Sequence, residues 1–157
     1  MMSVDWRRLR ANLGPAHLVG GIRVEHIAGD WRSITVALQP RGLRFSRREA
    51  HSGAALYAMT DPFPTLMVRH LMGPGFLVWD RAGSVELLAA ARGRVWARIE
   101  LDEDDVQRLH RMTADGARHL HVLSIDIRDA EGMAVARVEK MIYVRRTATA
   151  VGERDRR

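Results

Sequence analysis

Hydrophobic and polar residues alternate with the period of a β-strand in two segments near the start of the chain, residues 21–28 and 31–39. In the second segment Ile34, Val36 and Leu38 fall on one side, and polar or small residues separate them. Such alternation is typical of strands that bury one face. A Gly-Asp pair lies between the two segments and favours a turn, so we predict a β-hairpin.

The segment 52–72 lacks this alternation and predicts a buried helix. From Ser52 to Val68 it contains a single formal charge, Asp61, whereas a surface helix carries a charged stripe along one side. We therefore expect a long central helix that is buried on nearly all faces. The Gly-Pro-Gly sequence at 73–75 then ends this helix with a turn.

Beyond the turn the period returns to that of strands. We predict strands over residues 76–80, 83–89 and 94–101, a surface helix over 102–115, and two longer strands over 118–128 and 133–145. A hairpin, one buried helix and several further antiparallel strands indicate an α+β protein in which a curved sheet wraps the helix. A second subunit would cover the remaining face of that helix.

Length and composition limit the possible classes. The chain has 157 residues and no cysteine, so we expect one domain over residues 1–146 without disulfides or thiolate metal sites. Residues 4–13 predict a short N-terminal helix, and the polar residues 147–157 predict a disordered tail. No signal peptide or membrane-spanning stretch is evident, which favours a cytoplasmic protein without a membrane partner.

The net charge of +6 is a feature of many nucleic-acid binders, in which clustered basic side chains neutralise phosphates. Here the charge comes almost entirely from arginine scattered through strands and loops, and Lys140 is the only lysine. We therefore expect no nucleic-acid partner. Two local concentrations remain, one at 41–48 with Arg44, Arg47 and Arg48, and one at 145–146. Both could meet an anionic ligand, and solvated surface explains both equally simply.

Asp61 is the first candidate for chemistry. Burying a lone carboxylate costs several kcal/mol unless it is paired, and none of the residues three or four positions away in the helix is cationic. An unpaired carboxylate in such surroundings is a candidate general base or nucleophile. A structural alternative remains open, because Asp61 followed by Pro62 is also typical of a helix N-cap, with a kink or a second helix beginning at Asp61.

The second candidate is the start of the same helix, where His51, Ser52, Gly53 and Ala54 follow one another. Ser52 is a natural N-cap, and the free N–H groups of Gly53 and Ala54 could polarise the oxygen of a bound carbonyl group. Ordinary capping with tight packing of the helix on the sheet explains the same residues.

A family resemblance rests on three stretches. HSGAALYAMTDPF, FLVWDRAGSVELLAAARGRVWARIEL and DAEGMAVARVEKMIYVRR closely resemble an uncharacterised bacterial hotdog family that is grouped with thioesterases. They are more distantly similar to the phenylacetate-type acyl-CoA thioesterases, which carry a His-Gly-Gly segment and a helical Asp. Over residues 20–146 the resemblance implies a hotdog fold, with an antiparallel sheet wrapped around a long central helix. It also implies a homodimer or homotetramer in which sheets join edge to edge and active sites lie between subunits.

The resemblance also implies roles for single residues. Asp61 corresponds to the helical acid that attacks the thioester or activates water, and Gly53 and Ala54 to the N–H donors that hold the carbonyl oxygen. Ser84 lies where related enzymes place a hydroxyl group that helps to orient water. The chain departs from the pattern at Ala54, which replaces a glycine, and in the SRREA loop before the histidine.

The ligand implied is a small-molecule acyl-CoA, bound without a further cofactor. His51 and Ser52 would line its site, and Arg44, Arg47 and Arg48 are candidates to bind its nucleotide phosphates. Asp80, which follows Trp79 in a strand, is expected to make a structural polar contact.

Two histidines are a weaker candidate, for a metal site. His119 and His121 would project from one strand face, but no third ligand has suitable spacing, so we expect no metal site.

Hydrolysis of an acyl-CoA by Asp61 is the leading hypothesis. The alternative is a hotdog protein that binds an acyl group or acyl-CoA without cleaving it, which the altered loop and Ala54 favour. A hydratase or dehydratase would need an acid paired with a histidine, for which only His51 or His70 is available.

Overall fold

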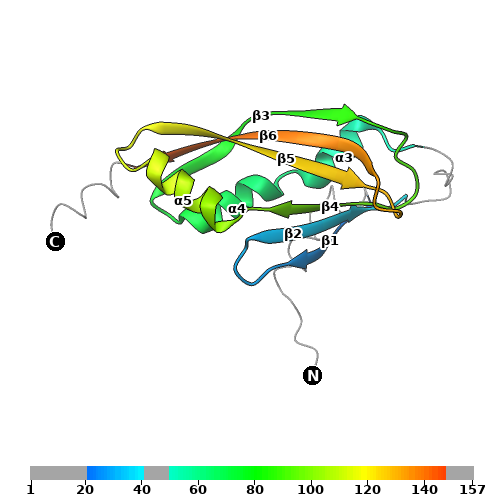
Figure 1. The fold of residues 1–157 in the computed structure, drawn as a ribbon, viewed down its shortest axis with the longest axis horizontal. Coiled ribbons are helices and arrows are strands. Elements are labelled where there is room, and N and C mark those ends of the chain that lie inside the picture. Colours follow the sequence, from blue (N-terminus) through cyan, green and yellow to red (C-terminus); the bar gives the residue numbers. More distant parts are fainter. Residues whose placement is uncertain (1–20, 41–49, 148–157) are drawn as a thin grey trace, which may run out of the picture.

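A six-stranded antiparallel sheet in the order β1-β2-β4-β5-β6-β3 forms the framework of the molecule, and the helices pack against it (Figure 1). The computed structural model describes residues 21–40 and 50–147. The predicted helix at 4–13, the arginines Arg44, Arg47 and Arg48, and residues 148–157 lie outside the described residues. Thr147, the first residue of the predicted tail, donates its backbone N–H to the carbonyl oxygen of Gly75 at 2.9 Å.

The elements follow the predicted order. They are β1 (Ile22–Ile27), β2 (Ser33–Leu38), α3 (Gly53–Thr60), α4 (Phe63–Met72), β3 (Phe76–Leu87), β4 (Val95–Glu100), α5 (Glu103–Met112), β5 (Arg118–Arg128) and β6 (Ala134–Arg146). The predicted α+β architecture, a sheet wrapped around a central helical segment, is confirmed. No helix in the described part of the chain is long and apolar enough to cross a membrane.

The predicted break between strands 76–80 and 83–89 is wrong. β3 is continuous from Phe76 to Leu87 and pairs with β6 along its whole length. A bulge between Asp80 and Ala82 shifts the register by one residue, and the alternation of the sequence therefore changes phase there. β3 is also the edge strand of the sheet.

The segment 52–72 was predicted as one helix, with a kink or a second helix at Asp61 as the alternative, and it consists of two helices. α3 ends at Thr60 and α4 begins at Phe63, and the peptide bond between Asp61 and Pro62 in the break is cis. Pro62 and Pro64 cannot donate backbone hydrogen bonds, which explains why one helix does not continue through them.

We expected the helical segment to be buried on nearly all faces, but both helices are partly exposed. Leu56 and Met59 of α3 are buried in the core, as are Met67 and Val68 of α4. Ala54, at the start of α3, is exposed. In α4, Leu66, Arg69 and His70 are exposed.

The core lies between these two helices and one face of the sheet, which we call the inner face. On β6 the inner face carries Val138, Ile142 and Val144, all of which are fully buried. The opposite, outer face of the sheet carries alternate residues such as Arg137 and Arg145, which are exposed. Each side chain of β6 can therefore be assigned to one face from its position in the strand.

Candidate functional site

Lys140 is the starting point of the site, because it is a charged residue within an apolar stripe. It lies on the inner face of β6 between Val138 and Ile142, and its side chain is only 1% exposed. An ammonium group in such a position costs several kcal/mol unless partners compensate it. Its contacts therefore show which polar groups of the inner face belong together.

Three side chains surround the Lys140 ammonium. It donates to Asp61 Oδ1 at 2.5 Å and to Tyr57 Oη at 2.9 Å, and it lies 3.4 Å from Asp80 Oδ1. The same Nζ lies 4.6 Å from the centroid of the Tyr57 ring, within the range of a cation–π contact. We call these four residues the lysine cluster. They come from α3, the α3–α4 break, β3 and β6.

Local structure explains how the cluster is assembled. Tyr57 and Asp61 are four residues apart and therefore face the same side of α3. Gly83 lies opposite Lys140 in the β3–β6 register, and a Cβ added at Gly83 would lie 2.3 Å from Tyr57 Oη. Only a glycine leaves room for the tyrosine to reach the lysine.

Asp61 is not the buried, unpaired acid that we expected. Its side chain is 43% exposed and forms an ion pair with Lys140, which lies 79 residues further along the chain. The capping hypothesis is also wrong, because Pro62 takes the N-cap position of α4 and no side chain caps it. Oδ2 of Asp61 accepts no hydrogen bond from any described residue, so one oxygen of a fixed carboxylate is left for solvent or a ligand.

The lysine cluster favours the protonated, charged form of Lys140. Burial opposes the charge, but the hydrogen bonds that Lys140 donates to Asp61 and Tyr57, together with the charges of Asp61 and Asp80, outweigh it and raise the pKa of Lys140. Two carboxylates face one ammonium, so the formal charge of the ionised cluster is −1.

The start of α3 is built as predicted. Ser52 is the N-cap, and its hydroxyl oxygen accepts a hydrogen bond from the Ala55 N–H at 3.2 Å. The N–H groups of Gly53 and Ala54 have no acceptor in the described part of the chain. Nε2 of His51 donates to Gly93 O at 2.7 Å and so ties the helix start to the loop before β4.

One chain does not bring the predicted catalytic groups together. Gly53 and Asp61 lie at opposite ends of α3, which has eight residues, so about 12 Å of helix separates them. Ser84 pairs with Glu139 on the outer face of β3, whereas Lys140 and its partners lie on the inner face. Within one subunit Ser84 therefore does not face Asp61.

The histidines are not brought to Asp61 either. His70 stacks on Trp31 with ring centroids 4.6 Å apart at the far end of α4, and His51 bonds to Gly93. His119 and His121 project from one face of β5 as predicted, with centroids 6.5 Å apart. Within residues 21–40 and 50–147, no three potential ligands gather to hold a metal ion.

Sequence reasoning missed Lys140 and Tyr57 as members of the site, and it gave Asp80 only a structural contact. The available signal was the phase of β6, because Lys140 is the one charged residue at an inner position among Val138, Ile142 and Val144. For Asp80 the signal was obscured by the bulge at Arg81.

Comparison with known proteins supports the fold. A family model described as "Domain of unknown function (DUF4442)" matches residues 20–144. A probable thioesterase of unknown function from Pseudomonas aeruginosa has a similar structure, with a TM-score of 0.75, 13% identity, and coverage of 93% of this chain and 97% of that one. A thioesterase from Haemophilus influenzae aligns with a TM-score of 0.64 and 15% identity, covering 93% and 92%.

A mutant thioesterase from Pseudomonas aeruginosa aligns with a TM-score of 0.63 and 13% identity, covering 94% of this chain and 97% of that one. No curated protein matches the chain. These likenesses confirm the predicted hotdog fold.

Proposed function

This chain belongs to the DUF4442 family, and from its site we propose that it hydrolyses a small-molecule thioester, with an acyl-CoA as the expected substrate. The observation that carries the proposal is the geometry of Asp61. One carboxylate oxygen is held by buried Lys140, the other is open, and the side chain has no capping role. The thioesterase names of proteins with the same fold support this reaction class.

In the proposed reaction Asp61 acts as general base. It accepts a proton from a water molecule, and the resulting hydroxide adds to the carbonyl carbon of the thioester. The C–S bond then breaks, and the thiolate leaves with the proton. Direct attack by the Asp61 carboxylate, followed by hydrolysis of the anhydride, uses the same position.

The oxyanion formed in this step needs N–H donors. We propose Gly53 and Ala54 for this role, because their N–H groups are open at the start of α3. Since about 12 Å of helix separates them from Asp61 in the same subunit, a complete site would combine Asp61 of one subunit with Gly53 of the partner subunit. The exposed edge strand β3 is the proposed place for the two sheets of a homodimer to join.

Asp61→Asn tests the proposal. It keeps the shape and an oxygen for Lys140 but removes the base, so kcat on an acyl-CoA should fall by about 10²- to 10⁴-fold. Asp104→Asn is the matched control, because Asp104 is an exposed aspartate on α5. The assay should include short, long and aromatic acyl-CoAs and follow release of free CoA. Wild-type turnover by Asp61→Asn would refute the mechanism.

A second function, binding of an acyl-CoA without cleavage, is favoured by one observation. Within a single chain the base and the oxyanion donors lie at opposite ends of α3. Equilibrium binding of the same acyl-CoA panel, with no free CoA released over hours by the wild-type protein, would support this function over hydrolysis.

A further inference from the structure

A pocket of about 670 Å³ lies at the C-terminal end of α4, where this helix meets the connection between β1 and β2 and the start of β3. We call it the α4 pocket. Its volume falls within the range of small-molecule sites, about 300–1,000 Å³. Aromatic, aliphatic and basic side chains line it, and none of the described residues that line it is acidic. The lining side chains are Trp31, Phe76, Leu66, Arg69 and His70, and Gly73 and Pro74 complete the wall.

The aromatic side of the α4 pocket depends on a strained residue. Trp31 has a φ of 61°, a conformation that a bulky side chain adopts only when its surroundings require it. In this conformation the indole ring stacks on the ring of His70, with centroids 4.6 Å apart and planes inclined by 24°. His70 is exposed and Trp31 is partly buried, so the stack presents a flat ring to solvent. Nucleic-acid bases stack on rings of this kind.

The basic side of the α4 pocket is oriented but not neutralised. Arg69 donates from Nη2 to the carbonyl oxygen of Val78 at 2.9 Å, which fixes the guanidinium group and leaves its other N–H groups available. Arg69 is exposed, and no carboxylate of the described residues lies within ion-pair distance of it. A fixed guanidinium group without a counter-ion suits a phosphate group.

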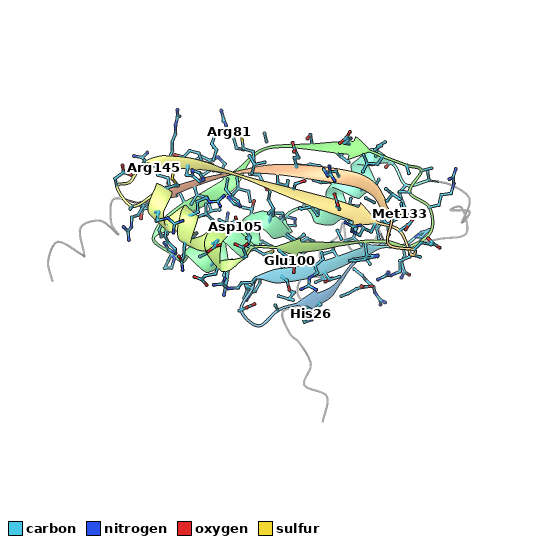
Figure 2. The ribbon with its side chains drawn as sticks, viewed as in Figure 1. His26, Arg81, Glu100, Asp105, Met133 and Arg145 are labelled. Atoms are coloured by element: carbon cyan, nitrogen blue, oxygen red, sulfur yellow. The ribbon has the colours of Figure 1, made fainter. Side chains whose placement is uncertain are left out.

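The acidic residues of this region line a different pocket. Asp30, which directly precedes the strained tryptophan, lines that other pocket. Glu100 and Asp105 line it as well, and Figure 2 shows them near the junction of β4 and α5. At the α4 pocket itself a second cation is close, because the guanidinium carbon of Arg146 lies 5.6 Å from the centroid of the Phe76 ring. The charge around the α4 pocket is therefore positive.

The exposed side of α4 connects the α4 pocket with Asp61. Pro62, Leu66 and Arg69 are all exposed, and their spacing of four and three residues places them on one side of the helix. Asp61 directly precedes Pro62, and its side chain is 43% exposed. From Asp61 to Arg69 the distance along the helix axis is about 12 Å. The pantetheine arm of CoA has roughly the bond count of four extended residues, so it spans about 13–14 Å.

We propose that the α4 pocket binds the nucleoside diphosphate part of CoA, so that the thioester at the other end of the pantetheine arm reaches Asp61. The inference rests on the proposed hydrolysis and names the carrier of the acyl group. The base stacks on His70, and Arg69 binds the diphosphate. An acyl chain does not suit this pocket, because hydrocarbon would remove the Arg69 guanidinium group from water without replacing its hydrogen bonds.

The preference for CoA over a shorter carrier tests the proposal. One acyl group is assayed as its CoA thioester and as its pantetheine thioester, which lacks the nucleotide. In the wild type, kcat/KM should be at least about tenfold higher for the CoA thioester, and Arg69→Met should lower this ratio about tenfold. Arg111→Met is the matched control, because Arg111 is also an exposed arginine in the last turn of a helix. Its ratio should equal that of the wild type.

Binding measurements separate this proposal from the proposed hydrolysis. Calorimetric titration with CoA and with adenosine 5′-diphosphate should show binding by the wild type and by Asp61→Asn, and binding at least about tenfold weaker by Arg69→Met and His70→Ala. Circular dichroism confirms that each variant is folded. Full turnover by Asp61→Asn with CoA still bound would contradict the hydrolysis mechanism alone.

Two results would overturn the nucleotide site. One is an equal kcat/KM of the wild type for the CoA and the pantetheine thioester. The other is a CoA affinity that Arg69→Met leaves at the wild-type value, which is the result expected if Arg69 only stabilises the C-terminal end of α4. In that case thermal unfolding of Arg69→Met would show a lower midpoint while CoA binding stayed intact.

Discussion

The inner and outer faces of the sheet differ in an unusual way at strands β3 and β6. On the inner face, where apolar residues are expected, β6 holds the fully buried Lys140 and β3 holds Asp80. On the outer face, where polar residues are expected, Tyr143 of β6 stacks on Trp79 of β3 with ring centroids 4.0 Å apart. Buried polar groups and exposed apolar patches are the informative exceptions in a folded chain.

The difference between the faces shows two kinds of exception. The polar group on the inner face is satisfied within the chain, because Lys140 has three partners, and this suggests that its geometry is needed for chemistry. The apolar groups on the outer face are left partly open to solvent within the chain. Local departures from a consistent pattern are expected at functional positions.

The largest expected effect comes from removing the inner-face ammonium. Lys140→Met should lower kcat on an acyl-CoA by about 10²-fold, because Oδ1 of Asp61 loses its hydrogen bond and the carboxylate is no longer held in position. KM should change much less, since the lysine does not face the ligand. Arg111→Met, at an exposed position on α5, is the control. An unchanged kcat in Lys140→Met would contradict the proposal that Lys140 holds Asp61 in position for catalysis.

A smaller effect is expected from filling the space under Tyr57. Gly83→Ala should lower the free energy of unfolding by about 1–3 kcal/mol, because the new methyl group overlaps the tyrosine ring and hydroxyl. Gly29→Ala is the matched control, since a Cβ there meets nothing within 4 Å. Urea denaturation compares the two variants. Equal stabilities would contradict the close packing of Tyr57 on Gly83.

On the outer face, Trp79→Ser removes a ring that stacks on Tyr143. It should lower the free energy of unfolding by about 1 kcal/mol, because the stack contributes within one subunit although both rings are partly open to solvent. Urea denaturation measures the change. A loss as large as that expected for Gly83→Ala would show that the outer face supports the fold as strongly as the inner face.

The smallest effect should appear at high pH. The pKa of Lys140 is raised in the folded protein by Asp61, Tyr57 and Asp80 despite the opposing effect of burial. Its contribution to stability is therefore complete below the pKa of an unfolded lysine, about 10.4, and decreases as the pH rises through the folded pKa. The stability difference between wild type and Lys140→Met should therefore shrink as the pH rises from about 10.4, and a constant difference would contradict this linkage.

Much of the fold could be predicted from the sequence. The alternation in β2 and β6 and the apolar segment around Asp61 gave the hairpins, the central helical segment and the antiparallel sheet. Two local features could not be read from alternation. The bulge at Arg81 inverts the phase of β3, and two prolines close together divide the helix.

The candidate site was predicted only in part. Asp61 was chosen because no helical neighbour could pair with it, but its partner comes from a strand 79 residues away. Periodicity within one element cannot report such a contact, because it depends on which strand lies under the helix. The role of Gly83 is hidden for the same reason, since it follows from the position of the Tyr57 ring.

The central claim is that Lys140 holds Asp61, and one spectrum tests it directly because the chain contains a single lysine. Protein grown with ¹³C- and ¹⁵N-labelled lysine should give one side-chain signal, which reports Lys140 alone. We predict that its titration midpoint lies above that of free lysine, moves down in Asp61→Asn and is unchanged in Asp104→Asn. A wild-type midpoint at the free-lysine value, or no response to Asp61→Asn, would contradict the account.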